Sequence, residues 1–300
     1  EEIITASGNP RSIWCFQGHA DRIIQVGEHE LTLFAQLYDE AGTEPLAARL
    51  PALHARQLLA VLEKFAAQPR RLGDLQGEYT SLEMWHETNA QNDGTIRRAT
   101  SFPADASQWI LSGPHFFVGN PFHQTPREIC ETHRAYDGLD LLSLPDDYLP
   151  RTNYLPACSP DEYRARTPRV SWIEAGETQP KRVTEYYRIG YRGMIGSASE
   201  RTLSCAVVPK EAGHMNGVRT YVFKSTTDLI RNAAGHYSVP FDFLLKSTGK
   251  QNLHQTLDEF PIIDFKELST AANIRVLALT ELTTHYSDLW QSCWDPAFQT

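Results

Sequence analysis

The chain has 300 residues, with 41% hydrophobic and 22% charged side chains, a composition typical of a globular protein with one large or two modest domains. It has no run of about 18 apolar residues, so no membrane-spanning helix is expected. Glu1-Glu2-Ile3-Ile4 carries neither a basic start nor an apolar signal core, which favours a cytoplasmic location. The missing initial Met suggests a fragment or a processed piece.

The distribution of charge says more than the net charge of −9, which argues against a general nucleic-acid coat. Residues 97–250 hold 19 basic and 16 acidic side chains, and most of the basic ones are arginine, whereas both ends of the chain are acidic. Arginine suits planar recognition of phosphates and guanine edges. The alternative is an ordinary surface with acidic ends.

The five cysteines, at positions 15, 130, 158, 205 and 293, are far apart and form no CxxC pair. This spacing favours buried, reduced thiols over a zinc cage or a disulfide framework. The histidines form no HExxH pattern, and no GxSxG nucleophile motif is present, so neither a metal site nor a hydrolase triad is expected.

The N-terminal segment shows helical spacing of apolar residues in 28–41 and again in 52–67, where Pro69 ends the pattern. Residues 1–70 are therefore expected to form a helical connector, with an acidic surface that suits packing against protein.

The middle of the chain predicts strands, short helices and a loop. Residues 108–118 indicate a strand, a turn and a second strand. Thr125-Pro126-Arg127-Glu128 has the pattern of a helix start, which predicts a short helix to about Arg134, and a second helix is expected from Ser159. Residues 136–160 are expected to form a long, ordered loop.

The last part of the chain predicts strands followed by helices. Residues 183–192, 201–208 and 218–224 are β-branched and aromatic, which is typical of strands. Helices are expected from Ser225 or Thr226 to Gly235, over 240–246, and over 268–292. The expected fold is α+β, with the helical N-terminal segment followed by a mixed α/β domain over 71–300 and a terminal helix.

Six stretches in order carry a family resemblance. They are SGPHFFVGNPFHQTPR (112–127), LPDDYLPRTNY (144–154), VTEYYRIGYRGM (183–194), SERTLSCAVVPKEAGHMNGV (199–218), SVPFDFLLKSTGKQNLHQTLDEFPII (238–263) and RVLALTELTTHYSDLW (275–290). Together they resemble the C-terminal target-recognition region of adenine-specific DNA methyltransferases of type IIG restriction-modification and phage-defence systems. The resemblance covers roughly residues 70–295.

The resemblance implies a division of labour. In that family the recognition region clamps double-stranded DNA while the catalytic domain flips the target adenine and transfers a methyl group from S-adenosylmethionine. This chain has no glycine-rich cofactor loop, and Gly119-Asn120-Pro121-Phe122 lacks one proline of the catalytic tetrapeptide. We interpret it as a strand-ending turn, with catalysis and the cofactor outside this chain. Whether the chain is itself an enzyme stays open.

The candidate DNA contacts begin at Arg188 and Arg192, which lie four apart and therefore point to one face of a strand. Ser197 lies in a small-residue loop that allows close approach of a phosphate, and Arg201 follows it. The alternative is that these arginines pair with local carboxylates such as Glu185 and Glu200.

Two further polar turns are candidates. Lys210, His214 and Asn216 follow a strand, and asparagine offers a bidentate match to adenine. Lys246 and Lys250 form a basic turn after a helix, where they either bind the DNA backbone or complement the helix dipole. The rival functions are a protein-interaction module of a defence complex without DNA contact, and an enzyme with an unrecognised pocket.

Overall fold

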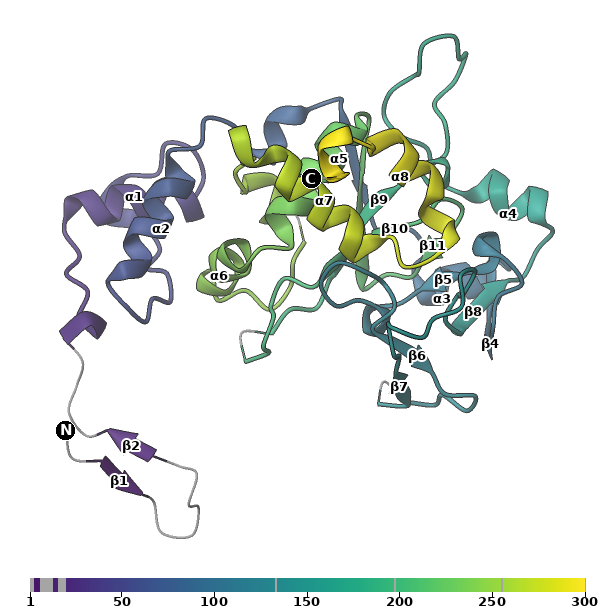
Figure 1. Ribbon diagram of the computed structural model, residues 1–300, viewed down its shortest axis with the longest axis horizontal. Coiled ribbons are helices and arrows are strands. Elements are labelled where there is room, and N and C mark those ends of the chain that lie inside the picture. Colours follow the sequence, from purple (N-terminus) through teal and green to yellow (C-terminus); the bar gives the residue numbers. More distant parts are fainter. Residues whose placement is uncertain are drawn as a thin grey trace. The chain divides into compact units, whose positions relative to one another are not determined.

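The computed structural model describes residues 3–5, 13–15, 20–132, 134–196, 198–254 and 256–299 (Figure 1). The fold is α+β, as the sequence predicts. The chain divides into two units, one of Glu1–Pro69 with Ser247–Gly249, the other of Arg70–Lys246 with Lys250–Thr300. None of the described helices is long and apolar enough to cross a membrane.

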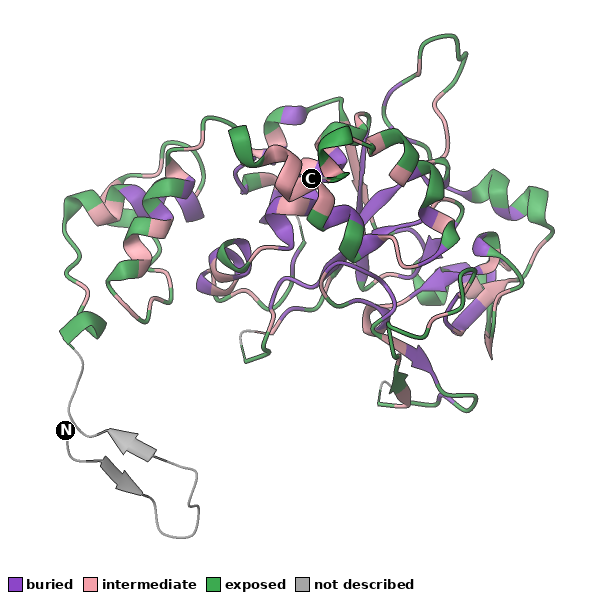
Figure 2. Cartoon of the chain, viewed as in Figure 1, coloured by how far each residue is buried: buried purple, intermediate pink, exposed green. Residues whose placement is uncertain are grey.

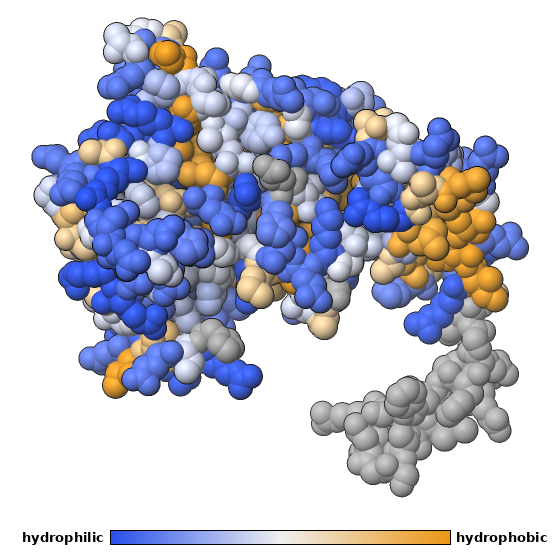
Figure 3. All heavy atoms as spheres, turned by 180° about the vertical axis from the view of Figure 1, so that it is seen from behind, coloured by the Kyte–Doolittle hydropathy of each residue, from blue (hydrophilic) through white to orange (hydrophobic). Residues whose placement is uncertain are grey.

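The first unit contains the two expected helices, α1 (Glu28–Tyr38) and α2 (Gln57–Ala66), which pack against each other. Both are shorter than their apolar patterns. The unit also holds strands β1 (Ile3–Thr5) and β2 (Ile13–Cys15), which pair antiparallel and have no counterpart among the expected elements. Apolar residues gather over this unit in Figure 3. Its exposed apolar side chains include Ile23, Val26, Leu46 and Leu50.

The core of the second unit is a four-stranded antiparallel sheet in the order β10-β9-β12-β3. The three β-branched and aromatic runs predicted as strands contribute β9, β10 and β12, whereas β3 was not predicted, and Figure 2 shows the burial of the sheet. Gly190 is required at the centre, because an added Cβ there would lie 2.8 Å from Phe116 and Val208. The bounds are Cys205–Val208 for β10, Arg188–Arg192 for β9, Val218–Phe223 for β12 and Tyr79–Leu82 for β3.

Four helices follow the last strand. The first begins where the Ser225 hydroxyl accepts a hydrogen bond from the Asp228 amide, and it packs on the sheet and on α7. The terminal helix expected over 268–292 is broken into two, because a 3-10 turn at Thr284–Tyr286 intervenes. The helices are α5 (Thr226–His236), α6 (Val239–Ser247), α7 (Ser269–Thr280) and α8 (Ser287–Cys293).

Smaller strand pairs surround the sheet. An antiparallel ribbon joins β4 (Ile96–Ser101) to β8 (Thr152–Pro156), and β5 (Ile110–Leu111) pairs parallel with β11 (Gly213–His214). The helices α3 (Glu87–Asn92) and α4 (Pro160–Arg166) flank the ribbon in sequence. As expected, α4 begins at Ser159, whose hydroxyl accepts a hydrogen bond from the Glu162 amide.

Three expectations for the middle of the chain are wrong. The described residues of 125–134 form no helix, and β6 (Gln124–Pro126) instead pairs antiparallel with β7 (Tyr136–Gly138). The Thr125 hydroxyl accepts from the distant Arg151 amide, so it does not cap a helix. The second strand expected by residue 118 is replaced by the 3-10 turn Gly113–His115, and the expected loop 136–160 contains β7 and β8.

Candidate nucleic-acid interface

The prediction that Arg188 contacts DNA is wrong, because its side chain is fully buried. The guanidinium donates hydrogen bonds to the carbonyl oxygens of Val183, Tyr186 and Ala212. Burial lowers the pKa of Arg188 to about 10. Arg188 and Arg192 alternate to the same side of β9, but only Arg188 is buried. Arg188 therefore ties the strand to its neighbours and is not presented to a ligand.

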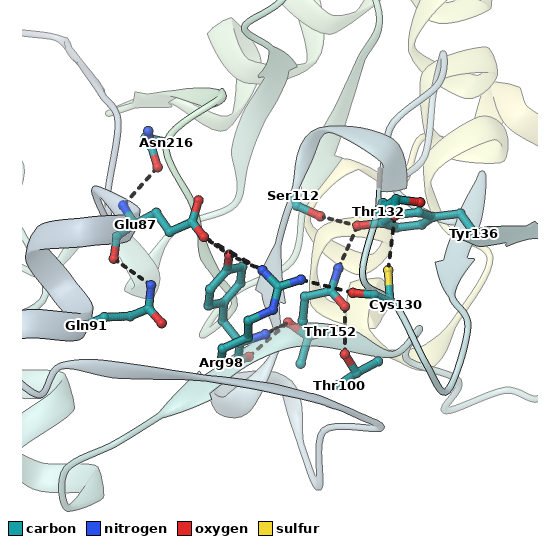
Figure 4. Close-up of polar contacts among 12 residues, drawn as sticks. Glu87, Gln91, Arg98, Thr100, Ser112, Cys130, Thr132, Tyr136, Thr152 and Asn216 are labelled. Atoms are coloured by element: carbon teal, nitrogen blue, oxygen red, sulfur yellow. Dashed lines mark hydrogen bonds and ion pairs between the residues drawn. The ribbon is translucent and has the colours of Figure 1, made fainter. Parts of the chain in front are cut away.

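His214 is also buried, and its ring lies within hydrogen-bonding distance of the Thr220 hydroxyl, 3.0 Å, and the Met215 carbonyl oxygen, 3.2 Å. Burial and the nearby charge of Arg188 lower its pKa to about 3. The Asn216 side-chain oxygen accepts a hydrogen bond from the Glu87 amide at 3.0 Å, at the start of α3 (Figure 4). Neither residue offers the free polar edge expected for reading bases.

Two lysines of the predicted interface are engaged within the protein. Lys210 pairs with Asp288 at 2.6 Å and lies 5.0 Å from the centre of the Tyr187 ring. Lys246 donates to the Ser199 carbonyl oxygen at 3.0 Å. The Lys210 pair is partly exposed, so its net contribution to stability is small, about 0–1 kcal/mol.

Lys250, the second lysine of the predicted basic turn, follows α6. Its ammonium donates a hydrogen bond to the Thr256 hydroxyl at 3.1 Å. Lys246 and Lys250 therefore each have an intramolecular partner, and neither is presented as an unengaged phosphate ligand.

Arg201 has a carboxylate partner, but not one of those named from the sequence. Its Nε lies 3.4 Å from Asp242, and its terminal nitrogen donates to the Tyr237 and Ser238 carbonyl oxygens. The same Asp242 oxygen accepts from the amides of Thr202 and Leu203 at 2.7 Å. Arg201 thus pins its own loop to the start of α6, and only 16% of its side chain is exposed.

Arg192 is different, because it is exposed at the end of β9. Among the residues the structure describes, none forms an ion pair or hydrogen bond with its guanidinium. The main-chain amide of Arg192 donates to the Ser204 carbonyl oxygen at 2.9 Å, which holds the backbone at the base of the side chain. Ser197, predicted in the next loop, lies outside the described residues.

A groove of about 210 Å³ runs beside Arg192. Its lining mixes polar and apolar side chains with two arginines, of which Arg201 is paired with Asp242, and no described lining residue is an aspartate or glutamate. Hydroxyls and an arginine are the side chains that commonly bind phosphates. The lining residues are Arg192, Met194, Ile195, Gly196, Ser199, Arg201, Thr202 and Ser204.

Sequence reasoning missed two aromatic residues near Arg192. The rings of Phe117 and His123 are stacked, with centroids 5.0 Å apart and an interplanar angle of 26°. The charge of Arg192 is close enough to act on His123, whose pKa is lowered first by burial and then by that charge. The sequence shows a high density of aromatic and histidine residues in 115–123. The contact between Phe117 and His123, however, depends on the turn between them, which the spacing does not predict.

A larger cleft, of about 840 Å³, lies between the β4–β8 ribbon, α4 and α8. It is lined by the cations Arg97, Arg164 and Lys210 and by five carboxylates, Asp105, Asp161, Glu185, Glu211 and Asp288. The described residues provide no ion pair for Asp161, Glu185 or Glu211. The surplus of carboxylates makes this cleft unfavourable for a polyanion.

Figure 4 shows a polar network beside that ribbon. Arg98 lies 3.8 Å from the Glu87 carboxylate and donates to the Cys130 carbonyl oxygen at 3.0 Å, and the Tyr154 hydroxyl donates to the same carboxylate. The charge of Arg98 is therefore shared with a neighbouring carboxylate. Arg98 is a weaker candidate for a phosphate than Arg192.

The tetrapeptide at 119–122 forms a buried turn. Gly119 has φ of 98°, and its carbonyl oxygen accepts hydrogen bonds from the Tyr237 and Thr280 hydroxyls at 3.3 and 3.1 Å. The Asn120 side-chain oxygen accepts from the Phe122 amide at 3.0 Å. These groups serve the fold and are not presented to a base.

Within the described part of the chain, no group of three or more His, Cys, Asp or Glu side chains is placed to hold a metal ion. Comparison of the chain with protein-family models and with curated proteins finds no match in either set.

Proposed function

We propose that this chain recognises double-stranded DNA for an adenine-specific methyltransferase of a restriction-modification or phage-defence system. The observation that carries the proposal is the exposed guanidinium of Arg192, which has no partner among the described residues and lies beside a groove whose described lining contains no carboxylate. Phosphates bind there, and the surrounding hydroxyls supply further donors. Catalysis and S-adenosylmethionine belong to a catalytic domain outside this chain.

Of the candidate residues, Arg192 alone combines exposure with a free guanidinium in the described chain, while Arg201 and Lys246 position the loop that forms the other side of the groove. The acidic cleft shares no lining residue with this groove, and its surplus of carboxylates disfavours a polyanion there.

Salt dependence tests the proposal directly. Duplex DNA binding is measured by fluorescence anisotropy between about 50 and 200 mM salt, where each phosphate contact contributes about 0.9 to the slope of log K against log salt. Arg192→Ala is expected to reduce the slope by about one contact. Arg164→Ala, in the acidic cleft, removes the same charge and leaves the slope unchanged. A slope near zero for the unaltered protein rejects DNA recognition.

A second measurement tests where the cofactor binds. Calorimetry with S-adenosylmethionine is expected to show no binding to this chain. Tight binding would place a cofactor site here and contradict the division between recognition and catalysis.

The acidic cleft favours one second candidate, a protein-interaction module. Asp161, Glu185 and Glu211, which have no ion pair among the described residues, suit a basic segment of a partner protein, because complementary charge steers and orients such complexes. Binding of a lysine-rich peptide, weakened by Glu211→Gln and by Glu185→Gln, supports this function. If the peptide does not bind, or binds the variants equally, the candidate is rejected.

A further inference from the structure

The stacked rings of Phe117 and His123, here called the aromatic pair, lie at the surface. Phe117 is 36% exposed, and the His123 side chain is exposed as well. An aromatic side chain gains most from full burial, so a stacked pair left at the surface retains apolar ring area that a ligand can cover. The aromatic pair therefore keeps exposed ring surface that a ligand could cover.

The backbone holds the pair in place. The His123 amide donates to the His115 carbonyl oxygen at 3.1 Å, and the His123 carbonyl oxygen accepts from the Leu139 amide at 3.3 Å. His115 is fully buried. The His123 ring itself has no hydrogen-bond partner among the described residues. Its backbone is anchored while its ring remains available.

Arg192 lies beside the loop that carries Phe117. A Cβ added to Gly113 would come within 3.6 Å of the Arg192 Cγ and 3.8 Å of its Nε, so the arginine stem passes directly over this glycine. Gly113 begins the 3-10 turn Gly113–His115, which leads into Phe117. Arg192 thus lies next to both the groove and the segment that bears the aromatic pair.

The charge of Arg192 also affects the ring chemistry. Burial and then this charge lower the pKa of His123 from its ordinary value, so the ring is neutral near pH 7. A neutral imidazole stacked on phenylalanine presents a flat, uncharged surface beside a cation. That combination of ring face and guanidinium is the one that single-stranded nucleic-acid sites use for base and phosphate.

We propose that the aromatic pair is a stacking site for an unstacked nucleobase of DNA, whose adjoining phosphate binds Arg192. The site takes a single unpaired nucleotide and has little preference among bases, because every base has a π-face. The inference rests on the proposed function for its phosphate contact, but the stacking contact is independent of it.

The test uses two single-stranded oligonucleotides of equal length and charge. One is oligo(dT), and the other is the same phosphodiester backbone with abasic residues. Stacking is expected to make oligo(dT) bind about 5-fold or more tightly than the abasic strand. Equal binding of the two strands by the unaltered protein overturns the proposal.

Substitutions in the aromatic pair test whether it causes the preference for oligo(dT) over the abasic strand. Phe117→Leu keeps an apolar side chain but removes the ring, and it is expected to abolish the preference for oligo(dT) while leaving abasic binding unchanged. Phe117→Trp is expected to retain it, and His123→Phe likewise. A preference that survives Phe117→Leu overturns the assignment. Circular dichroism and thermal melting confirm that each variant is folded.

A spectroscopic signal separates the two contacts. An oligonucleotide with one 2-aminopurine is expected to lose fluorescence on binding, because stacking on an aromatic ring quenches it, and Phe117→Leu is expected to restore the emission. If Arg192→Ala leaves the duplex salt slope unchanged while quenching persists, the phosphate assignment fails and stacking stands. If the slope changes but no quenching occurs, the stacking site fails and the proposed function stands.

Discussion

The Tyr191 hydroxyl and the His236 Nδ1 lie 2.6 Å apart in the core, where β9 meets α5. Burial lowers the pKa of His236 to about 3, and His214 is lowered to a similar value by burial and by the charge of Arg188. Both rings are neutral in the folded protein at weakly acidic pH. In the unfolded chain they become protonated below about 6.5.

Stability is therefore expected to depend on pH in a defined direction. Because unfolding takes up protons at these histidines, their contribution to the free energy of unfolding is complete above about pH 6.5. It decreases as the pH falls from there toward about 3. Each histidine contributes at most about 1.4 kcal/mol per pH unit. Urea titrations near pH 7 and pH 5 measure the slope. His236→Gln is expected to reduce the number of protons taken up on unfolding by about one, and with it the slope. An unchanged slope contradicts the burial of a neutral His236.

Replacing the buried Arg188 is expected to destabilise the protein. Arg188→Met keeps much of the side-chain volume but leaves the carbonyl oxygens of Val183 and Ala212 without this donor. Lost hydrogen bonds of this kind cost about 1–3 kcal/mol each. The expected loss of about 3 kcal/mol is measured by urea unfolding. Arg164→Met, on the exposed side of α4, is the matched control and changes stability by about 0.5 kcal/mol or less.

Packing around Gly190 leaves no room for a side chain. An added Cβ would lie 2.8 Å from both Phe116 and Val208, so Gly190→Ala forces these core residues apart. Such overpacking costs about 1–3 kcal/mol. Thermal melting measures the loss, and Gly138→Ala, where no atom lies within 4 Å of the added Cβ, is the control. Equal effects of the two substitutions would show that β9 adapts to the methyl group.

Glu281 is expected to reverse the usual behaviour of a carboxyl. Burial raises its pKa to about 8, and its Oε1 has no hydrogen-bond partner in the described chain. A raised pKa gives stability that is present below the unfolded value and is lost as the pH rises through about 8. Glu281→Gln is therefore expected to gain stability relative to the unaltered protein between about pH 7 and pH 9. A difference in melting temperature that is constant over this interval argues against burial of a neutral carboxyl.

The regular elements of the second unit were largely predictable. β-Branched runs gave β10 and β12, and the Ser159-Pro160 start gave α4, because these signals are local. The false helix at Thr125 shows where local signals fail. Its hydroxyl bonds to the amide of Arg151, a partner that only tertiary structure supplies.

The predicted interface depended on exposure, which sequence spacing does not determine. Arg188 and Arg192 have the same alternation along β9, yet the first is buried and the second is exposed, with no side-chain partner among the described residues. A hint was present, because β9 carries Ile189 and Tyr191 on its other face and lies among apolar strands. The approach of His123 to Phe117 and Arg192 depends on the turn at 113–115 and was beyond any periodicity argument.

The register of the main sheet has a consequence for biosynthesis. Leu82 on β3 lies opposite Thr220 on β12, so an early segment of the chain pairs with one that emerges from the ribosome much later. Until then Tyr79 and its neighbours have no strand to complete their hydrogen bonds. The growing chain therefore carries β3 without its partner strand until β12 has been synthesised, and a truncation before β12 leaves β3 permanently unpaired and available for aggregation.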